Sequence, residues 1–170
     1  MDSSSHYGLI LFVEDEAPFR KIYKNVLEQK GYKLLEAMDG EMGWTLVKAK
    51  KPSLVLIDMV LPKLSGRELL KRIRADAETK DIPIIMCSVI GDKKEIESCL
   101  KEGADDYAIK GTFVPTEITV MIEMAIQKRN RPDKDRLKTT LVEGKHGKLE
   151  VKTVKLTSEP AKKKKAKKTS

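Results

Sequence analysis

The chain has 170 residues, 40% of them hydrophobic, which is enough for one ordinary domain with a core of its own. Its two cysteines form no CxxC motif or Cys/His cluster, and no apolar stretch approaches the ~20 residues of a membrane helix. Composition therefore argues against a disulfide scaffold, a structural zinc site and a transmembrane segment. The net charge of +8 is divided unevenly, with residues 128–170 at +11 and residues 1–127 at −3.

Short apolar runs alternate with helical patterns from the start of the chain to about residue 128. In chain order, the patterns predict strands at 8–13, 32–37, 54–57, 83–87 and 106–109, and helices at 17–30, 39–50, 67–75, 92–102 and 115–128. Pro18 fits the first turn of its helix, Gly31 ends that helix, and Asp39 can cap the next one. The polar, acidic start of the chain is unlike a signal peptide, so we expect a cytoplasmic protein.

Five strand–helix units in ~120 residues predict a doubly wound α/β fold with a parallel sheet. The crossovers between parallel strands are right-handed, which places helices on both faces of the sheet. A strand covered on both faces reads as a continuous apolar run, as residues 8–13 do. Ligands of such folds bind outside the carboxyl ends of the strands, and this edge is where we look for chemistry.

Polar side chains follow four of the five predicted strands. Glu14 and Asp15 follow the first strand, Asp58 the third, Ser88 the fourth and Lys110 the fifth. In a parallel sheet these residues converge on one edge, where three carboxylates repel one another unless a cation neutralises them. Oxygen ligands and a nearby phosphate suit Mg²⁺, and the sequence therefore predicts a magnesium-dependent phosphoryl site.

Each of these residues also has an ordinary structural explanation. An acid after a strand often favours the next helix N-terminus, a serine can be a loop hydroxyl, and a lysine can be a solvated charge. For any one residue that explanation is the better choice. The functional interpretation depends on the conjunction of suitable residue types at four strand ends.

These residues lie in stretches that resemble the receiver domain of two-component response regulators. The stretches are ILFVEDE at 10–16, LVLIDMVLPKLSG at 54–66, IIMCS at 84–88 and GADDYAIK at 103–110. The resemblance covers about residues 6–128. It implies a flavodoxin-like (βα)5 fold with strand order 2-1-3-4-5.

The resemblance also implies a role for each site residue. Asp58 is the expected phosphoacceptor, taking its phosphoryl group from a histidine kinase or a phosphotransfer protein. Asp15, Asp58 and the main-chain carbonyl of Val60 are expected to bind Mg²⁺ directly, and Glu14 through water. The remaining expected roles belong to three residues: Ser88 and Lys110 stabilise the phosphoryl group, and Ser88 and Tyr107 form the switch pair.

A phosphorylation-activated response regulator of this kind acts in phosphorelay signal transduction as a stand-alone receiver rather than as an enzyme. Its output is expected to be phospho-gated binding of a protein partner through the surface of the fourth helix, fifth strand and fifth helix. The same surface is a candidate homodimer interface.

Several positions depart from the common pattern of the family. Glu14 stands where Asp is more usual, Gly111 replaces the usual Pro after Lys110, and Val89 replaces a small residue. Val60 and Ile90 are aliphatic where polar groups of the family help to position the attacking water. We therefore expect slow self-dephosphorylation.

The basic extension leaves a second interpretation open. The sequence divides into an N-terminal tail at 1–6, a receiver at 7–128, an extension at 129–158 that is a candidate β-hairpin, and a disordered Lys-rich tail at 159–170. Lysine runs are often only solvated, but they also bind nucleic-acid phosphates without reading sequence. The alternative is thus a protein that binds nucleic acid through its basic C-terminal tail, with the receiver as a regulatory or dimerisation module. A degenerate receiver that takes no phosphate is a third option, which the intact acidic residues, Ser88 and Lys110 oppose.

Overall fold

The computed structural model describes residues 8–112, 116–130, 137–143 and 149–155. The chain divides into two units, Met1–Asn130 and Arg131–Ser170. The N-terminal tail expected at 1–6 and the Lys-rich tail expected at 159–170 lie outside the described residues.

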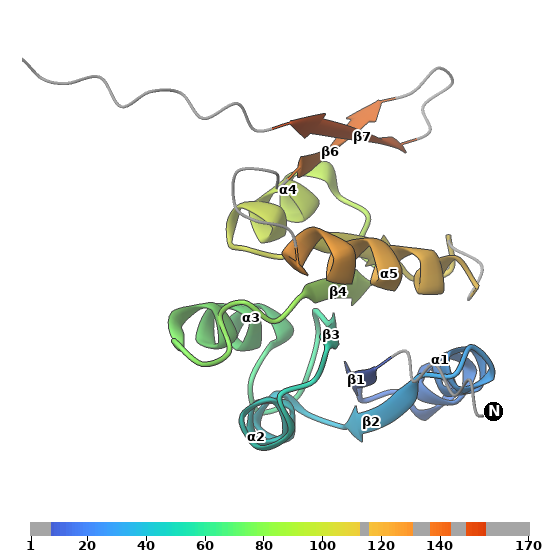
Figure 1. Ribbon diagram of the computed structural model, residues 1–170, viewed down its shortest axis with the longest axis vertical. Coiled ribbons are helices and arrows are strands. Elements are labelled where there is room, and N and C mark those ends of the chain that lie inside the picture. The colour runs from blue at the N-terminus through green and yellow to red at the C-terminus, as the bar shows by residue number, and fades with distance from the viewer. Residues whose placement is uncertain (1–7, 113–115, 131–136, 144–148, 156–170) are drawn as a thin grey trace, which may run out of the picture. The chain divides into compact units, whose positions relative to one another are not determined.

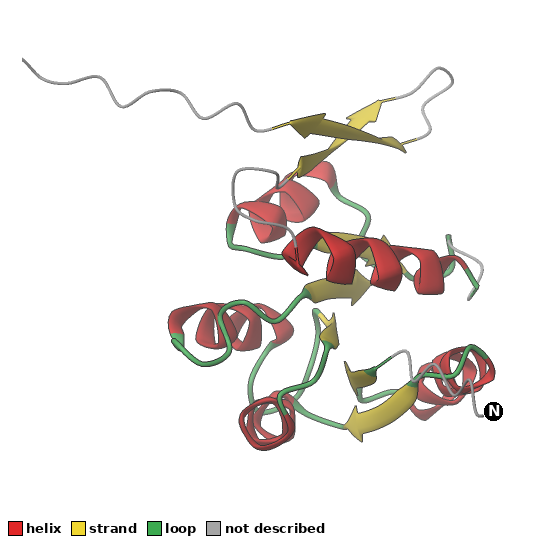
Figure 2. Cartoon of the chain, viewed as in Figure 1, coloured by secondary structure: helices red, strands yellow, loops and turns green. Residues whose placement is uncertain are grey.

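The first unit is built on five parallel strands in the order β2-β1-β3-β4-β5 (Figure 1). In chain order its elements are β1 (Leu9–Val13), α1 (Ala17–Gln29), β2 (Lys33–Ala37), α2 (Gly40–Lys50), β3 (Leu54–Asp58), α3 (Gly66–Ala75), β4 (Ile84–Ser88), α4 (Lys93–Lys101), β5 (Asp106–Ile109) and α5 (Glu117–Asn130). The expected flavodoxin-like strand order is confirmed. Helices and strands alternate throughout this unit (Figure 2).

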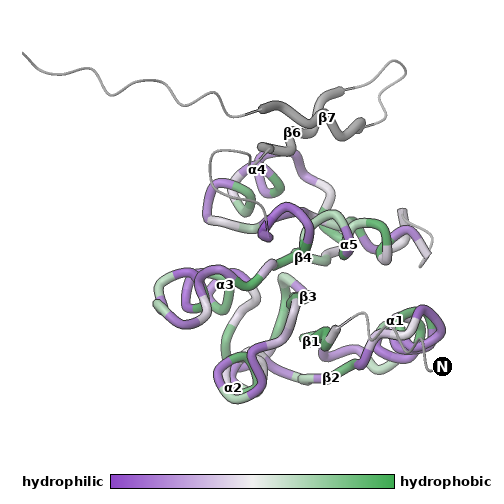
Figure 3. Tube along the Cα trace, viewed as in Figure 1, coloured by the Kyte–Doolittle hydropathy of each residue, from purple (hydrophilic) through white to green (hydrophobic). Residues whose placement is uncertain are grey.

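The helices cover the sheet in two groups. In Figure 1, α1 and α5 lie on one side of the strands, and α2, α3 and α4 lie on the other. Between the sheet and the α1/α5 side, Phe12 and Leu56 pack in a core cluster with Tyr23, Leu27 and Ile122. Figure 3 shows hydrophobic stretches in the central strands alternating with hydrophilic helix segments. Burial on both faces explains why β3 and β4 are apolar almost without interruption.

Local signals in the sequence set several helix ends. The side chain of Asp39 accepts a hydrogen bond from Met42 N and caps α2 as expected. Ser65 and Glu68 form a capping box at the start of α3, with each side chain satisfying the other residue's backbone N–H. Because this cap ends the β3–α3 loop, it fixes the chain that follows Asp58.

Two glycines allow close backbone contacts beside the carboxyl ends of the strands. A Cβ on Gly66 would lie 1.9 Å from the backbone oxygen of Asp58, and one on Gly40 would lie 2.0 Å from the backbone oxygen of Leu64. Neither neighbour is a flexible side chain that could move away. Gly66 also donates its N–H to the carbonyl of Met59 at 3.1 Å. The β3–α3 loop therefore folds back tightly against the end of β3.

We expect Gly66→Ala to destabilise the protein by about 3 kcal/mol, because overpacking against a fixed backbone forces the loop to shift. Gly91→Ala is the matched control, since the nearest atom to its Cβ is the end of the Ile109 side chain at 3.2 Å. We expect the control to change stability by no more than about 0.5 kcal/mol. Urea unfolding followed by circular dichroism measures both, and equal effects of the two substitutions would contradict the prediction.

In the second unit, β6 (Leu137–Glu143) and β7 (Leu149–Lys155) pair in antiparallel fashion. These strands fall in the extension where the sequence offers a β-hairpin as a candidate, and residues 144–148 between them lie outside the described residues. Among the helices that the structure describes, none is both long enough and apolar enough to cross a membrane.

Candidate functional site

Asp58 is the last residue of β3, which lies between β1 and β4. Its side chain lies at the carboxyl edge of the sheet, and the residue is only 5% exposed. A buried carboxylate is costly unless a cation or hydrogen-bond donors compensate it. The surroundings of Asp58 therefore have to supply positive charge.

Lys110 supplies that charge from the end of β5. Its Nζ lies 2.8 Å from Asp58 Oδ2 and 2.5 Å from Glu14 Oε2. Burial alone would lower the pKa of Lys110, but the two carboxylates outweigh burial and raise it. The backbone N–H of Lys110 donates to the carbonyl of Ser88 at 2.8 Å, which fixes the lysine beside β4. Gly111 follows in a left-handed conformation at φ +82°, and the Lys110–Gly111 peptide bond is trans.

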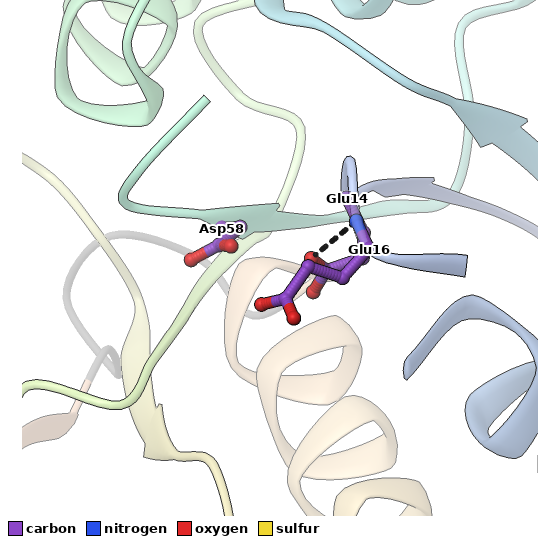
Figure 4. Close-up of side chains that lie close together, drawn as sticks. All are labelled: Glu14, Glu16 and Asp58. Atoms are coloured by element: carbon purple, nitrogen blue, oxygen red, sulfur yellow. Dashed lines mark hydrogen bonds between the residues drawn. The ribbon is translucent and has the colours of Figure 1, made fainter. Parts of the chain in front are cut away.

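An acidic cluster faces this lysine. Glu14, Glu16 and Asp58 each place one carboxylate oxygen within 4.8 Å of the others, and Figure 4 shows the three side chains together. Glu16 N donates to Glu14 Oε1 at 3.2 Å. Burial raises the pKa of the Glu14 carboxyl to about 7, aided by the charge of Asp58 and opposed by Lys110. Three hard oxygen donors that repel one another fit a divalent cation such as Mg²⁺.

Asp15 is not part of this cluster, although the sequence singles it out as a metal ligand. Its side chain is exposed, and Glu16 takes its place among the clustered carboxylates. Arg20 holds the turn that carries these acids: its Nη1 donates to the carbonyls of Glu14 at 2.9 Å and of Asp15 at 2.7 Å. Sequence reasoning missed Arg20 because a basic residue in the first turns of an amphipathic helix looks like an ordinary solvated charge.

Ser88 and Tyr107 lie on the adjacent strands β4 and β5, and both are buried. The Ser88 hydroxyl oxygen accepts a hydrogen bond from Ile90 N at 3.1 Å, and the Tyr107 hydroxyl donates to the carbonyl of Ile90 at 2.9 Å. Burial raises the pKa of Tyr107. Both members of the expected switch pair are thus tied to the same residue of the β4–α4 loop.

Part of the rim of the site is apolar. Val60, Val89 and Ile90 are all exposed, and each lies within two residues of Asp58 or Ser88. The backbone N–H of Val60 lies 3.4 Å from Asp58 Oδ1, at the long end of hydrogen bonding. Aliphatic side chains offer no group that could hold a water in line with a phosphoryl group on Asp58.

The two cysteines are buried and make no disulfide. Cys87 pairs with Asp58 across β3 and β4, and its burial strongly raises the pKa of the thiol. Burial also raises the pKa of Cys99, on α4, to about 11. A thiol with a raised pKa is a poor nucleophile, so neither cysteine competes with Asp58 for chemistry.

Comparison with known proteins links this geometry to signalling. Residues 10–123 match the sequence model of the response regulator receiver domain. The phosphate regulon transcriptional regulatory protein PhoB of Pseudomonas aeruginosa is 37% identical over 126 residues, 74% of this chain and 55% of PhoB. The chemotaxis protein CheY1 of Helicobacter pylori is 36% identical over 119 residues, 69% of this chain and 95% of CheY1. The chain matches only about half the length of the PhoB-type relatives.

Solved structures agree with the fold. A response regulator from Chloroflexus aurantiacus has a TM-score of 0.67 at 28% identity and covers 71% of this chain and 98% of its own. The receiver domain of the sensor histidine kinase PA1611 from Pseudomonas aeruginosa has a TM-score of 0.65 at 27% identity, with the same coverage of 71% and 98%. That receiver is described as having a magnesium ion coordinated in its active-site cleft.

Proposed function

This chain belongs to the response regulator receiver domain family, and on that premise we propose that it accepts a phosphoryl group on Asp58 and signals by phospho-gated binding of a protein partner. The observation that carries the proposal is the buried Asp58 carboxylate, which lies 2.8 Å from Lys110 Nζ and beside the acidic cluster. The donor is a histidine kinase or a phosphotransfer protein. The chain acts as a phosphoacceptor rather than as a dedicated enzyme.

Asp58 is the nucleophile of this proposal. One of its carboxylate oxygens forms a bond to phosphorus as the donor's P–N bond breaks, and the bonding electrons leave with the imidazole nitrogen. Lys110 is already within ion-pair distance of Asp58 and offers its ammonium to an oxygen of the arriving group. The Ser88 hydroxyl, at the end of the neighbouring strand, accepts from Ile90 N and has its own O–H to donate to a second oxygen.

The acidic cluster is the proposed place of Mg²⁺. Asp58, Asp15 and the Val60 carbonyl are the proposed direct ligands, with Glu14 acting through water, and the position of Glu16 makes it a further candidate. The Asp15 side chain is exposed and lies outside the cluster, so its role as a ligand rests on the family resemblance rather than on this geometry. When bound, the metal supplies positive charge that offsets the carboxylates and the phosphoryl oxygens.

The test is amide NMR of the full chain, titrated first with Mg²⁺ and then with beryllofluoride, which mimics an acyl phosphate without needing the cognate donor. We expect shifts around Asp58, Ser88, Tyr107 and Lys110, and we expect Asp58→Ala to abolish the beryllofluoride response. Absence of shifts in the wild-type chain would mean that the receiver is degenerate.

The apolar rim leads to a prediction about the lifetime of the phosphoryl group. We expect Val60→Asn to speed self-dephosphorylation roughly tenfold, because an amide at this exposed position can hold a water near phosphorus. The measurement is loss of ³²P from protein labelled on Asp58. Val120→Asn, at an exposed position on α5, is the control and should leave the rate unchanged. A wild-type half-life of seconds would contradict the expectation of a slow basal rate.

A second candidate function follows from the net charge of +11 on residues 128–170. Lysine and arginine bind nucleic-acid phosphates electrostatically, and salt weakens such binding steeply. Removing residues 129–170 separates the two candidates. If the receiver signals alone, the truncated chain still binds its protein partner in a phosphorylation-dependent way. If nucleic-acid binding is the function, the truncated chain no longer binds nucleic acid.

A further inference from the structure

Phe19 contacts the buried lysine of the site from α1. The centre of its ring lies 4.5 Å from Lys110 Nζ, well inside the range of a cation–π interaction. The ring is partly buried and packs against the core cluster between the sheet and the α1/α5 side. Its position is therefore set by the core, not by the charges of the site.

Lys110 depends on its neighbours because its side chain is only 2% exposed. An ammonium group has three N–H donors. Glu14 and Asp58 lie at 2.5 and 2.8 Å from Nζ, and the ring of Phe19 makes a third contact. All three contacts replace the water that a surface lysine would keep.

An aromatic ring constrains the orientation of the Lys110 ammonium less than a third oxygen acceptor would. The face of the ring attracts the cation through its quadrupole, and the attraction is stronger away from water. The ring accepts no strong, directional hydrogen bond, so it does not hold any single N–H in place. Lys110 can thus turn between oxygen partners while it stays at the same position beside Asp58.

We propose that Phe19 is a positioning residue for Lys110: its ring holds the desolvated ammonium beside Asp58, so that the ammonium can pass from a carboxylate to an arriving phosphoryl oxygen. The inference deepens the proposed phosphoryl acceptance at Asp58 and rests on it. Phe19 itself need touch neither the metal nor the phosphoryl group. Phe19 is thus distinct from the proposed magnesium ligands, which are carboxylates and the carbonyl of Val60.

The experiment compares four forms of the full chain: wild type, Phe19→Leu, Phe19→Tyr, and a form with pentafluorophenylalanine placed at position 19 by amber suppression. Leucine keeps apolar bulk without a ring, tyrosine keeps the ring face, and pentafluorophenylalanine keeps the shape while reversing the quadrupole. Ile22→Ala, at an exposed position on the same helix, controls for general disturbance of α1. Urea unfolding verifies that each form is folded under the assay conditions.

Two measurements are made on each form. The ¹⁵N and ¹H shifts of the Lys110 ammonium report its environment without any phosphoryl mimic, and NMR titrations give the affinities for Mg²⁺ and then for beryllofluoride. We expect the leucine and pentafluoro forms to shift the ammonium signal and to bind beryllofluoride roughly 5- to 30-fold more weakly. We expect wild-type behaviour from the tyrosine and Ile22→Ala forms, and an unchanged Mg²⁺ affinity in all of them.

The outcomes separate the inference from the proposed function. If the pentafluoro form matches wild type while the leucine form does not, Phe19 only fills space and the inference fails. If neither form changes the ammonium shift, the inference also fails. If wild-type protein shows no beryllofluoride response, the proposed function fails, and the ammonium shifts alone then decide whether Phe19 positions Lys110.

Discussion

We expect Lys110→Met to lower the free energy of unfolding by about 3 kcal/mol in magnesium-free buffer, because removing one partner of a buried ion pair leaves the other uncompensated. Glu14 and Asp58 both contact Lys110 and both are buried, so two carboxyl groups are left without the ammonium in this variant. Methionine keeps most of the volume of the lysine stem, so the change isolates the charge. Lys110→Arg keeps the charge and should cost less.

Magnesium should then restore part of the lost stability. A divalent cation bound to the native acidic cluster replaces the missing positive charge, and a ligand that binds only the folded state stabilises it. The measurement is urea unfolding with EDTA and with excess MgCl₂. If Lys110→Met were as stable as wild type in EDTA, the ammonium would not be what compensates Glu14 and Asp58.

We expect a second large effect, a loss of about 3–5 kcal/mol, from Asp105→Ala at the opposite edge of the sheet. Asp105 accepts hydrogen bonds from Arg74 Nη2 at 2.9 Å, from Arg129 Nε at 2.6 Å and from Ile84 N at 2.9 Å. Its side chain joins the end of α3, the start of β4 and the last turn of α5. Burial lowers the pKa of Arg74 only to about 10, so this arginine stays charged at pH 7 and loses its partner in the variant.

Asp106 is the matched control for this prediction. Burial raises the pKa of its carboxyl above 3.8, opposed by the backbone N–H of Tyr107 and the charge of Lys128. The native state therefore binds this proton more tightly than the unfolded state, and ionisation of Asp106 destabilises the protein as pH rises through its folded pKa. Asp106→Asn should leave the stability unchanged or raise it at pH 7. Any gain in stability over wild type should become smaller as the pH falls toward 3.8. Thermal unfolding at pH 7 and pH 4.5 tests both variants, and equal losses from the two would contradict the assignment.

Much of the fold could be predicted because the central strands are buried on both faces. A strand such as Leu54–Asp58 must then be a continuous apolar run that ends at a polar residue, and the run marks both the strand and the site. Asp39 also marks the start of α2 by its capping chemistry. Strands and helices with local sequence signals of this kind appear where the sequence predicts them. The strand order is the one that the family resemblance implies.

The remaining features of the site depend on side-chain directions that spacing does not define. Asp15 and Glu16 are neighbours in a turn, and only the backbone course decides which carboxylate meets Asp58. Phe19 lies at an apolar position typical of any amphipathic helix, so the pattern predicts that it is buried but not that it contacts Lys110. The residue roles at the site remain predictions, as does the division of the chain at residue 128.

The burial of both native thiols has a practical consequence for site-specific labelling of this protein. Because the sequence has only two cysteines, and both are folded away with raised pKa values, neither should react readily with a maleimide at neutral pH. A single cysteine introduced at an exposed position would then be the preferred attachment point for a fluorophore or a spin label. The environment and mobility of that label could be followed during phosphorylation without first removing Cys87 from the strand next to Asp58.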